Sequence, residues 1–191
     1  MFVFILRFIY LRQTKNEVEI MGLLNKQWFV AKTRANQERA VKERLEAMNI
    51  ETYLPTRMEI RQRRDRKKKV EVVLIPNTLF IYADKNTALS LPNHHGFLIK
   101  YMIDYMTRTL LVVPEKQMQN FMFLMDLSDD NVQVDNNLLF EKGDKIRVVK
   151  GPFCGIEGEL IRVEGKNKVL VRLENIIACT MEVSSSYLEK I

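Results

Sequence analysis

The distribution of glycine is the sequence feature that most constrains how this chain can fold. Five of the seven glycines fall in residues 139–191, at Gly143, Gly151, Gly155, Gly158 and Gly165. They separate short runs rich in β-branched residues, at 145–149, 159–163, 169–173 and 177–183. Glycine adopts the positive φ of tight turns without cost, and regularly spaced short strands with glycine turns are typical of a small barrel. We therefore predict a small β-barrel over residues 139–191.

Residues 27–126 have a mixed pattern that indicates an α+β domain. Residues 27–33 predict a strand, and Asn36 is the expected N-cap of a helix over residues 37–49, where apolar residues recur on one face. The other expected elements are strands at 50–54, 79–82, 97–103 and 109–113, a loop or short helix at 84–96, and a last helix at 114–126. We expect an antiparallel sheet flanked by helices. The polar, acidic segment that follows predicts a linker over residues 127–138.

The most charged part of the chain is residues 57–69, with eight basic and two acidic residues. Met58 and Ile60 alternate with charged residues, a period of two that predicts a strand, and residues 70–75 form the expected return strand. The pattern predicts a hairpin with a basic tip. Such a charge run is either a solvated loop that keeps a sheet edge soluble or a binding surface for nucleic acid.

The overall charge favours the N-terminal half as the basic part of the molecule. The net charge is +6 and the sequence pI is about 9.3, a balance compatible with a nucleic-acid or ribonucleoprotein partner. Residues 139–191 carry nine basic and eight acidic residues, so this segment contributes only +1. A basic barrel that binds RNA directly is therefore not what the sequence predicts.

The sequence contains no pattern typical of an enzyme. The only histidines, His94 and His95, are neighbours in a polar segment, and no Gly-rich phosphate cradle or pair of carboxylates stands out. Cys154 and Cys179 form neither a C-x-x-C pair nor a disulfide framework. We expect no catalytic residues, no metal, no cofactor and reduced cysteines in a cytoplasmic protein.

The first twenty residues do not fit either predicted domain. Residues 1–11 are apolar apart from Arg7, about half the length that a spanning helix needs, and no signal-peptide cleavage pattern follows. A well-patterned segment begins soon after Met21. Our hypothesis is that Met21 is the physiological start and that residues 1–20 are a non-native or flexible extension, not a membrane anchor.

Two stretches resemble one family. Residues 140–159 (FEKGDKIRVVKGPFCGIEGE) closely resemble the KOW motif of NusG-type elongation factors, a motif that ribosomal proteins also contain. Residues 27–53 resemble the opening strand and helix of the NusG N-terminal domain, and residues 74–81 resemble its central strand. The chain is thus identified as NusG-like from about residue 27 to 191. The resemblance implies a NusG-type α/β sandwich at 27–126 and an SH3-like KOW β-barrel at 139–191.

One departure from the family pattern suggests a specialised member. Housekeeping members carry Pro-Gly-Tyr before the central strand, whereas this chain has Pro76, Asn77 and Thr78. That difference, with a compact N-terminal domain, resembles RfaH and the UpxY antiterminators of capsular polysaccharide operons. The C-terminal domain of RfaH can also fold as a helical hairpin, whereas residues 139–191 of this chain predict a barrel with no stable helical alternative. The alternatives are a housekeeping factor that couples polymerase to Rho or the ribosome, and a KOW-type RNA-binding or ribosomal protein.

The resemblance also implies partners and contact residues. NusG-like factors sit on the RNA polymerase clamp, and Lys32 and the loop after the first strand lie where the family makes that contact. The predicted polymerase-binding residues are Trp28, Phe29, Lys32, Leu89, His94 and His95. The predicted binders of upstream or non-template DNA are Arg61, Arg63, Arg64, Arg66, Lys67, Lys68 and Lys69. The predicted anchor for a KOW partner, a small-subunit ribosomal protein or Rho, is formed by Gly151, Pro152 and Phe153.

Each of these assignments has a simpler rival. Since a strand directs Trp28 and Phe29 to opposite faces, we expect one of them to be core. Phe153 could instead be buried beneath its own hairpin, and the two histidines could be solvated without a role. We expect a monomer. The target operon and any recruiting element are beyond what the sequence predicts.

Overall fold

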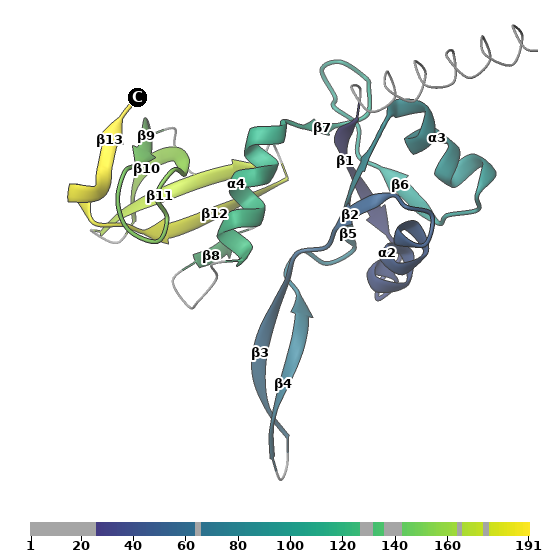
Figure 1. Ribbon diagram of the computed structural model, residues 1–191, viewed down its shortest axis with the longest axis horizontal. Coiled ribbons are helices and arrows are strands. Elements are labelled where there is room, and N and C mark those ends of the chain that lie inside the picture. Colours follow the sequence, from purple (N-terminus) through teal and green to yellow (C-terminus); the bar gives the residue numbers. More distant parts are fainter. Residues whose placement is uncertain (1–25, 64–65, 127–131, 136–142, 164–165, 174–175) are drawn as a thin grey trace, which may run out of the picture. The chain divides into compact units, whose positions relative to one another are not determined.

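The computed structural model describes residues 26–63, 66–126, 132–135, 143–163, 166–173 and 176–191 (Figure 1). The chain divides into two compact units. One contains the residues up to Tyr53 together with Asn77–Val112, and the other contains Leu54–Pro76 together with Val113–Ile191. The expected extension at residues 1–20 lies outside the described residues.

The first unit is built on an antiparallel sheet of order β2-β5-β1-β6. Its strands are β1 (Gln27–Thr33), β2 (Glu51–Tyr53), β5 (Thr78–Ala83) and β6 (Ile99–Tyr101), and the short β7 (Val112–Val113) also pairs with β1. Strand β5 is almost completely buried and β1 is buried from Trp28 to Ala31, which explains their runs of apolar residues. The predicted antiparallel sheet flanked by helices is confirmed for this unit.

Two helices accompany this sheet, and local hydrogen bonds explain where each begins. Helix α3 (Lys85–His94) follows Asp84, whose carboxylate accepts hydrogen bonds from the backbone N–H groups of Asn86 and Thr87, both at 3.0 Å. Residues 84–96, expected to form a loop or a short helix, therefore contain a helix. Helix α2 (Glu38–Glu46) begins after Gln37, which makes no side-chain cap. The prediction of Asn36 as N-cap is wrong, because Asn36 adopts a left-handed turn conformation with φ of 60°.

The second unit contains an antiparallel hairpin of β3 (Thr56–Arg63) and β4 (Arg66–Val73). These strands form a two-stranded sheet of their own. The predicted hairpin is therefore confirmed.

The same unit contains a six-stranded antiparallel sheet of order β13-β9-β10-β11-β12-β8. Four strands match the expected runs, and two others, β8 and β13, were not expected. The strands are β8 (Val132–Asp135), β9 (Asp144–Val148), β10 (Glu157–Val163), β11 (Lys166–Leu173), β12 (Ile177–Glu182) and β13 (Leu188–Lys190). A short 3-10 turn, η1 (Ser185–Tyr187), precedes the last strand. Strand β8 lies within the expected linker and pairs with β12. Its sequence alternates Val132 and Val134 with polar residues, a period typical of a strand.

Helix α4 (Glu115–Asp126) packs against β11 of the six-stranded sheet. Lys116 Nζ lies 2.6 Å from Glu157 Oε2, and Arg147 Nη2 lies 2.7 Å from Glu157 Oε1, so one carboxylate links α4 to β9 and β10. The helix buries four apolar side chains, at Met118, Phe121, Leu124 and Met125. We expected this helix to close the N-terminal domain. Its apolar stripe predicts burial but does not specify the surface that covers it.

None of the described helices is long and apolar enough to cross a membrane.

Candidate nucleic-acid interface on a basic hairpin

The β3–β4 hairpin has two chemically different faces. Its register runs without interruption from Thr56 opposite Val73 to Arg63 opposite Arg66. Directly opposed residues share a face, and successive residues alternate between faces. One face, named the arginine face, carries Arg57, Glu59, Arg61, Arg66 and Lys68. The other, named the aliphatic face, carries Thr56, Met58, Ile60, Gln62, Lys67, Lys69, Glu71 and Val73.

The arginine face contains one carboxylate, which is held between two guanidinium groups. Glu59 lies 3.1 Å from Arg57 Nη2 and 3.5 Å from Arg61 Nη2. The hydrogen bond from Arg57 and the nearby positive charge of Arg61 lower the pKa of Glu59. Within the described part of the chain, Arg66 and Lys68 make no ion pair. Cationic charge on this face therefore exceeds what Glu59 neutralises.

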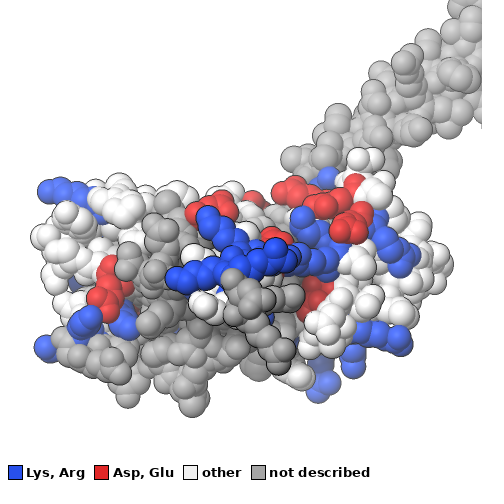
Figure 2. Space-filling view, turned by 90° about the horizontal axis from the view of Figure 1, so that it is seen from below, with Lys and Arg blue, Asp and Glu red and all other residues white. Residues whose placement is uncertain are grey.

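The structure divides the seven residues predicted to bind nucleic acid. Arg61, Arg66 and Lys68 lie on the arginine face, whereas Lys67 and Lys69 lie on the aliphatic face. Arg63 shares the arginine face by register, although its side chain lies outside the described residues, as does the whole of Arg64. Figure 2 shows Lys and Arg side chains gathered in a band over the hairpin.

The predicted polymerase-binding residues on β1 lie on both faces of the strand. Trp28 packs against Tyr82 with ring centroids 5.0 Å apart, and Phe29 packs against Tyr101 at 6.1 Å. Both are buried, with exposed fractions of 2% and 1%. We expected one of the two to be core, and the structure buries both, because both faces of this central strand are covered.

Lys32 lies on the same face of β1 as Trp28, near the end of the strand, and is exposed. Its Nζ donates a hydrogen bond of 2.8 Å to Thr78 Oγ1, and burial of the stem lowers the pKa of Lys32. Leu89 and His94 lie on α3 and His95 follows it, and all three are exposed. The structure thus places one exposed candidate on β1 and three around α3.

The turn at residues 151–155 differs from the predicted partner anchor. The Phe153 side chain is buried, with 9% exposure, whereas Gly151, Pro152 and Cys154 are exposed. Gly151 has φ of 84°, and a Cβ there would lie 3.2 Å from the ring of Tyr187. The interpretation of Phe153 as an exposed anchor is not supported. Burial beneath its own hairpin, the rival reading, agrees with the structure.

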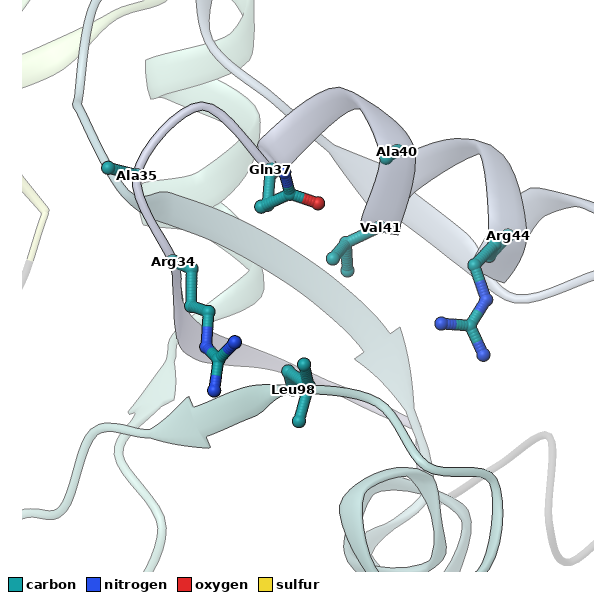
Figure 3. A pocket seen from close by; sticks show the side chains of 7 residues that line it. All are labelled: Arg34, Ala35, Gln37, Ala40, Val41, Arg44 and Leu98. Carbon is teal, nitrogen blue, oxygen red and sulfur yellow. The ribbon is translucent and has the colours of Figure 1, made fainter.

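A pocket of about 380 Å³ opens beside the loop that follows β1 (Figure 3). The Arg34 and Arg44 side chains extend into it beside Leu98, and Arg44 also stacks over the ring of Phe97 with 4.3 Å to the centroid. The other lining residues are Ala35, Gln37, Ala40 and Val41. The sequence predicted this loop as a contact region. It did not predict the pocket, because Leu98 is far in the sequence from the other lining residues, which lie between 34 and 44. Arg34 directly after a strand was the one available signal.

These features describe a basic α+β protein of two compact units, one of which contains the charged β3–β4 hairpin. The described residues bring together no group of three His, Cys, Asp or Glu side chains that could hold a metal ion. The family model described as "Transcription termination factor nusG" matches residues 26–122, just over half of the chain. The chain therefore belongs to the NusG family, which consists of transcription factors and not of enzymes.

Two solved structures are similar to the chain. "Domain interaction in Thermotoga maritima NusG" has 21% sequence identity and a TM-score of 0.46, and the match covers 89% of this chain and 99% of that chain. "Crystal Structure of MjSpt4:Spt5 complex conformation A" has 16% identity and a TM-score of 0.26, and the match covers 86% and 97%. No curated protein matches the chain.

Proposed function

We propose that this chain is a transcription elongation or antitermination factor that binds the RNA polymerase clamp and contacts neighbouring nucleic acid with the β3–β4 hairpin. Family membership supports the polymerase as a partner, since factors of the NusG and Spt5 type bind it. The observation that carries the nucleic-acid part is the arginine face, where cations outnumber the single carboxylate of Glu59. The protein acts in the cytoplasm, as a monomer, without a cofactor.

The chemistry of the arginine face suits a phosphate backbone and not a base sequence. Guanidinium and ammonium groups bind phosphate oxygens and release counterions, which gives an affinity that falls steeply with salt. Residues 56–73 contain no aromatic side chain on which a base could stack. The proposed ligand is therefore upstream duplex or non-template DNA, bound without sequence preference.

The proposed polymerase contacts are the exposed candidates. Lys32 and the neighbouring loop would contact the clamp, and Leu89, His94 and His95 would contact the opposite side of the cleft. The exposure of these side chains supports the assignment. Trp28 and Phe29 act indirectly, because they are buried and shape the sheet beneath that surface.

We propose that the six-stranded sheet is a KOW domain that recruits a small-subunit ribosomal protein or Rho. The exposed residues of the turn at 151–155, Gly151 and Pro152 among them, are its contact surface. The family domains in this proposal remain residues 27–126 and 139–191, joined by residues 127–138. Strand β8 lies within residues 127–138 and pairs with β12 of the six-stranded sheet.

An operon-specific role of the polysaccharide type is the finer form of the proposal, with a housekeeping role as the alternative. Asn77 suggested the specialised role because housekeeping members carry glycine there. Asn77 adopts φ of 59°, a conformation that glycine and asparagine both tolerate. The substitution therefore preserves the backbone and does not by itself favour the specialised role. A gene position at the head of a polysaccharide operon would favour it.

Site-specific photocrosslinking tests the nucleic-acid part of the proposal. A benzoylphenylalanine in place of Lys68 reports from the arginine face, and the same residue in place of the exposed Glu43 on α2 is the matched control. We expect crosslinks from position 68 to DNA in an elongation complex, and none from position 43. Crosslinks from position 68 to RNA alone, or equal DNA crosslinking from both positions, would reject the assignment.

A further inference from the structure

The apolar residues on the two faces of the hairpin differ in how far they are exposed to solvent. On the arginine face, Val70 and Val72 are half-buried, and they lie directly opposite Glu59 and Arg57, whose side chains pair with each other. On the aliphatic face, Met58 and Ile60 have exposed fractions of 60% and 65%. The hairpin therefore shields its valines and presents two large aliphatic side chains to solvent on the other side.

These two side chains form one continuous strip. Met58 and Ile60 are two residues apart on β3, so they stand next to each other on one face. A two-stranded hairpin in water is marginally stable without a covered face, and exposed neighbouring aliphatic residues on a β-sheet are typical of a surface that another molecule covers.

The chemistry around the strip argues against nucleic acid as the molecule that covers it. Glu71 lies directly opposite Met58, and its Oε1 accepts a hydrogen bond of 2.7 Å from Thr56 Oγ1, which holds the carboxylate on this face. A carboxylate repels phosphate. Aliphatic side chains also lack the aromatic face on which unpaired bases stack.

A protein surface fits the same pattern of charge. Lys69 lies opposite Ile60 and Lys67 lies opposite Gln62, so the strip has cations toward the hairpin tip and the Glu71 carboxylate toward its base. The complementary surface is an apolar patch with carboxylates on the side nearer the tip and a cation or hydrogen-bond donor on the other. RNA polymerase, which factors of the NusG and Spt5 type bind, is the candidate for the protein that carries this surface.

We propose that the aliphatic face of the hairpin docks on a protein surface of RNA polymerase while the arginine face holds nucleic acid. This inference rests on the proposed function and extends it, because it makes the hairpin a two-sided element that lies between polymerase and DNA. The two contacts are separable: removing Met58 and Ile60, which are uncharged, leaves the salt dependence of binding unchanged, whereas removing cations of the arginine face reduces it.

The test compares binding of full-length variants to two targets, core polymerase without nucleic acid and a reconstituted elongation complex. The variant Met58→Thr/Ile60→Thr removes the apolar strip but keeps strand-forming residues. Met58→Leu/Ile60→Val keeps the strip apolar. Met106→Thr changes an apolar side chain that is 92% exposed elsewhere and is the matched control. Arg61→Gln/Lys68→Gln tests the other face.

We expect the Thr double variant to bind core polymerase about tenfold more weakly, with an unchanged dependence of affinity on salt. The Leu/Val variant and Met106→Thr should bind like the wild type. The Gln double variant should bind core polymerase like the wild type but lose about two units of salt slope on the elongation complex.

Two results would overturn the inference. One is equal binding of the Thr double variant and the wild type to both targets, and the other is a defect of that variant confined to free DNA, which would make the strip a nucleic-acid contact. Failure of the wild type to bind either target is a different outcome, because it rejects the proposed function together with this inference. Circular dichroism melts of each variant separate a folding defect from lost binding.

Discussion

The carboxylate of Glu38 accepts a hydrogen bond of 2.7 Å from the backbone N–H of Asn77. The bond joins the first turn of α2 to the residue that leads into β5, and Asn77 in turn accepts a hydrogen bond of 2.9 Å from the N–H of Thr33. The end of β1 and the start of β5 are thus tied to each other and to the first turn of α2. Glu38 has an exposed fraction of only 6%, so the bond lies largely out of water.

The first prediction concerns this bond. Glu38→Ala leaves a backbone N–H without its partner, and we expect it to lower the free energy of unfolding by about 1–3 kcal/mol. Glu43→Ala, on an exposed position of the same helix, should change that free energy by less than about 0.5 kcal/mol. Urea denaturation of both variants measures the difference. Equal stability of the two variants would show that the Glu38 bond is replaced by water.

The second prediction concerns the backbone of Asn77. Because φ is 59°, Asn77→Gly should be tolerated, whereas Asn77→Val should cost about 1–2 kcal/mol in the free energy of unfolding. The same pair of variants tests the functional reading of this position. If Asn77 only serves the turn, Asn77→Gly retains all activity on the target operon. A loss of activity in a stable Asn77→Gly protein would restore Asn77 as a specificity residue.

The third prediction separates packing from partner binding at the turn of residues 151–155. Since Phe153 is buried, Phe153→Ala should destabilise the sheet by about 3 kcal/mol, and Phe153→Leu by less. Thermal unfolding of the two variants measures this order. Phe153→Leu should also bind the KOW partner normally, whereas substitution of the exposed Pro152 by Glu should weaken that binding. An unchanged melting temperature in Phe153→Ala would contradict the burial.

The fourth prediction concerns the two cysteines. Burial raises the pKa of the Cys179 thiol to about 12, whereas Cys154 is exposed in the turn. The thiolate is the reactive form, so iodoacetamide at pH 8 should modify Cys154 alone in the folded protein and both cysteines after denaturation. Mass spectrometry of tryptic peptides identifies the modified residue. Rapid native labelling of Cys179 would mean that β12 opens easily.

The sequence predicted most of the architecture where a pattern was local. Alternation of Met58 and Ile60 with charged residues predicted β3, and the glycine spacing predicted four strands of the second sheet. Strand β8 was missed, because its two valines stand in an acidic segment that resembles a linker. Its pairing with β12 depends on a partner more than forty residues away in the sequence.

The parts that sequence reasoning missed depend on contacts between distant residues. An apolar stripe shows that α4 is buried on one side, but nothing in it identifies β11 as the surface that it covers. The pocket between Arg34, Arg44 and Leu98 forms only when α2 and the segment before β6 are brought together by the sheet. The two faces of the hairpin follow from the register of β3 on β4, which a charge count alone does not contain.

The most direct test of the account is binding of the full-length chain to a reconstituted elongation complex that includes upstream DNA, measured in competition with free structured RNA and small ribosomal subunits. We expect binding to the complex that excess RNA does not displace and that weakens as salt is raised. No binding to the complex at low salt, combined with binding to free RNA or to the ribosomal subunit, would contradict the elongation-factor assignment and favour a KOW-type RNA-binding protein.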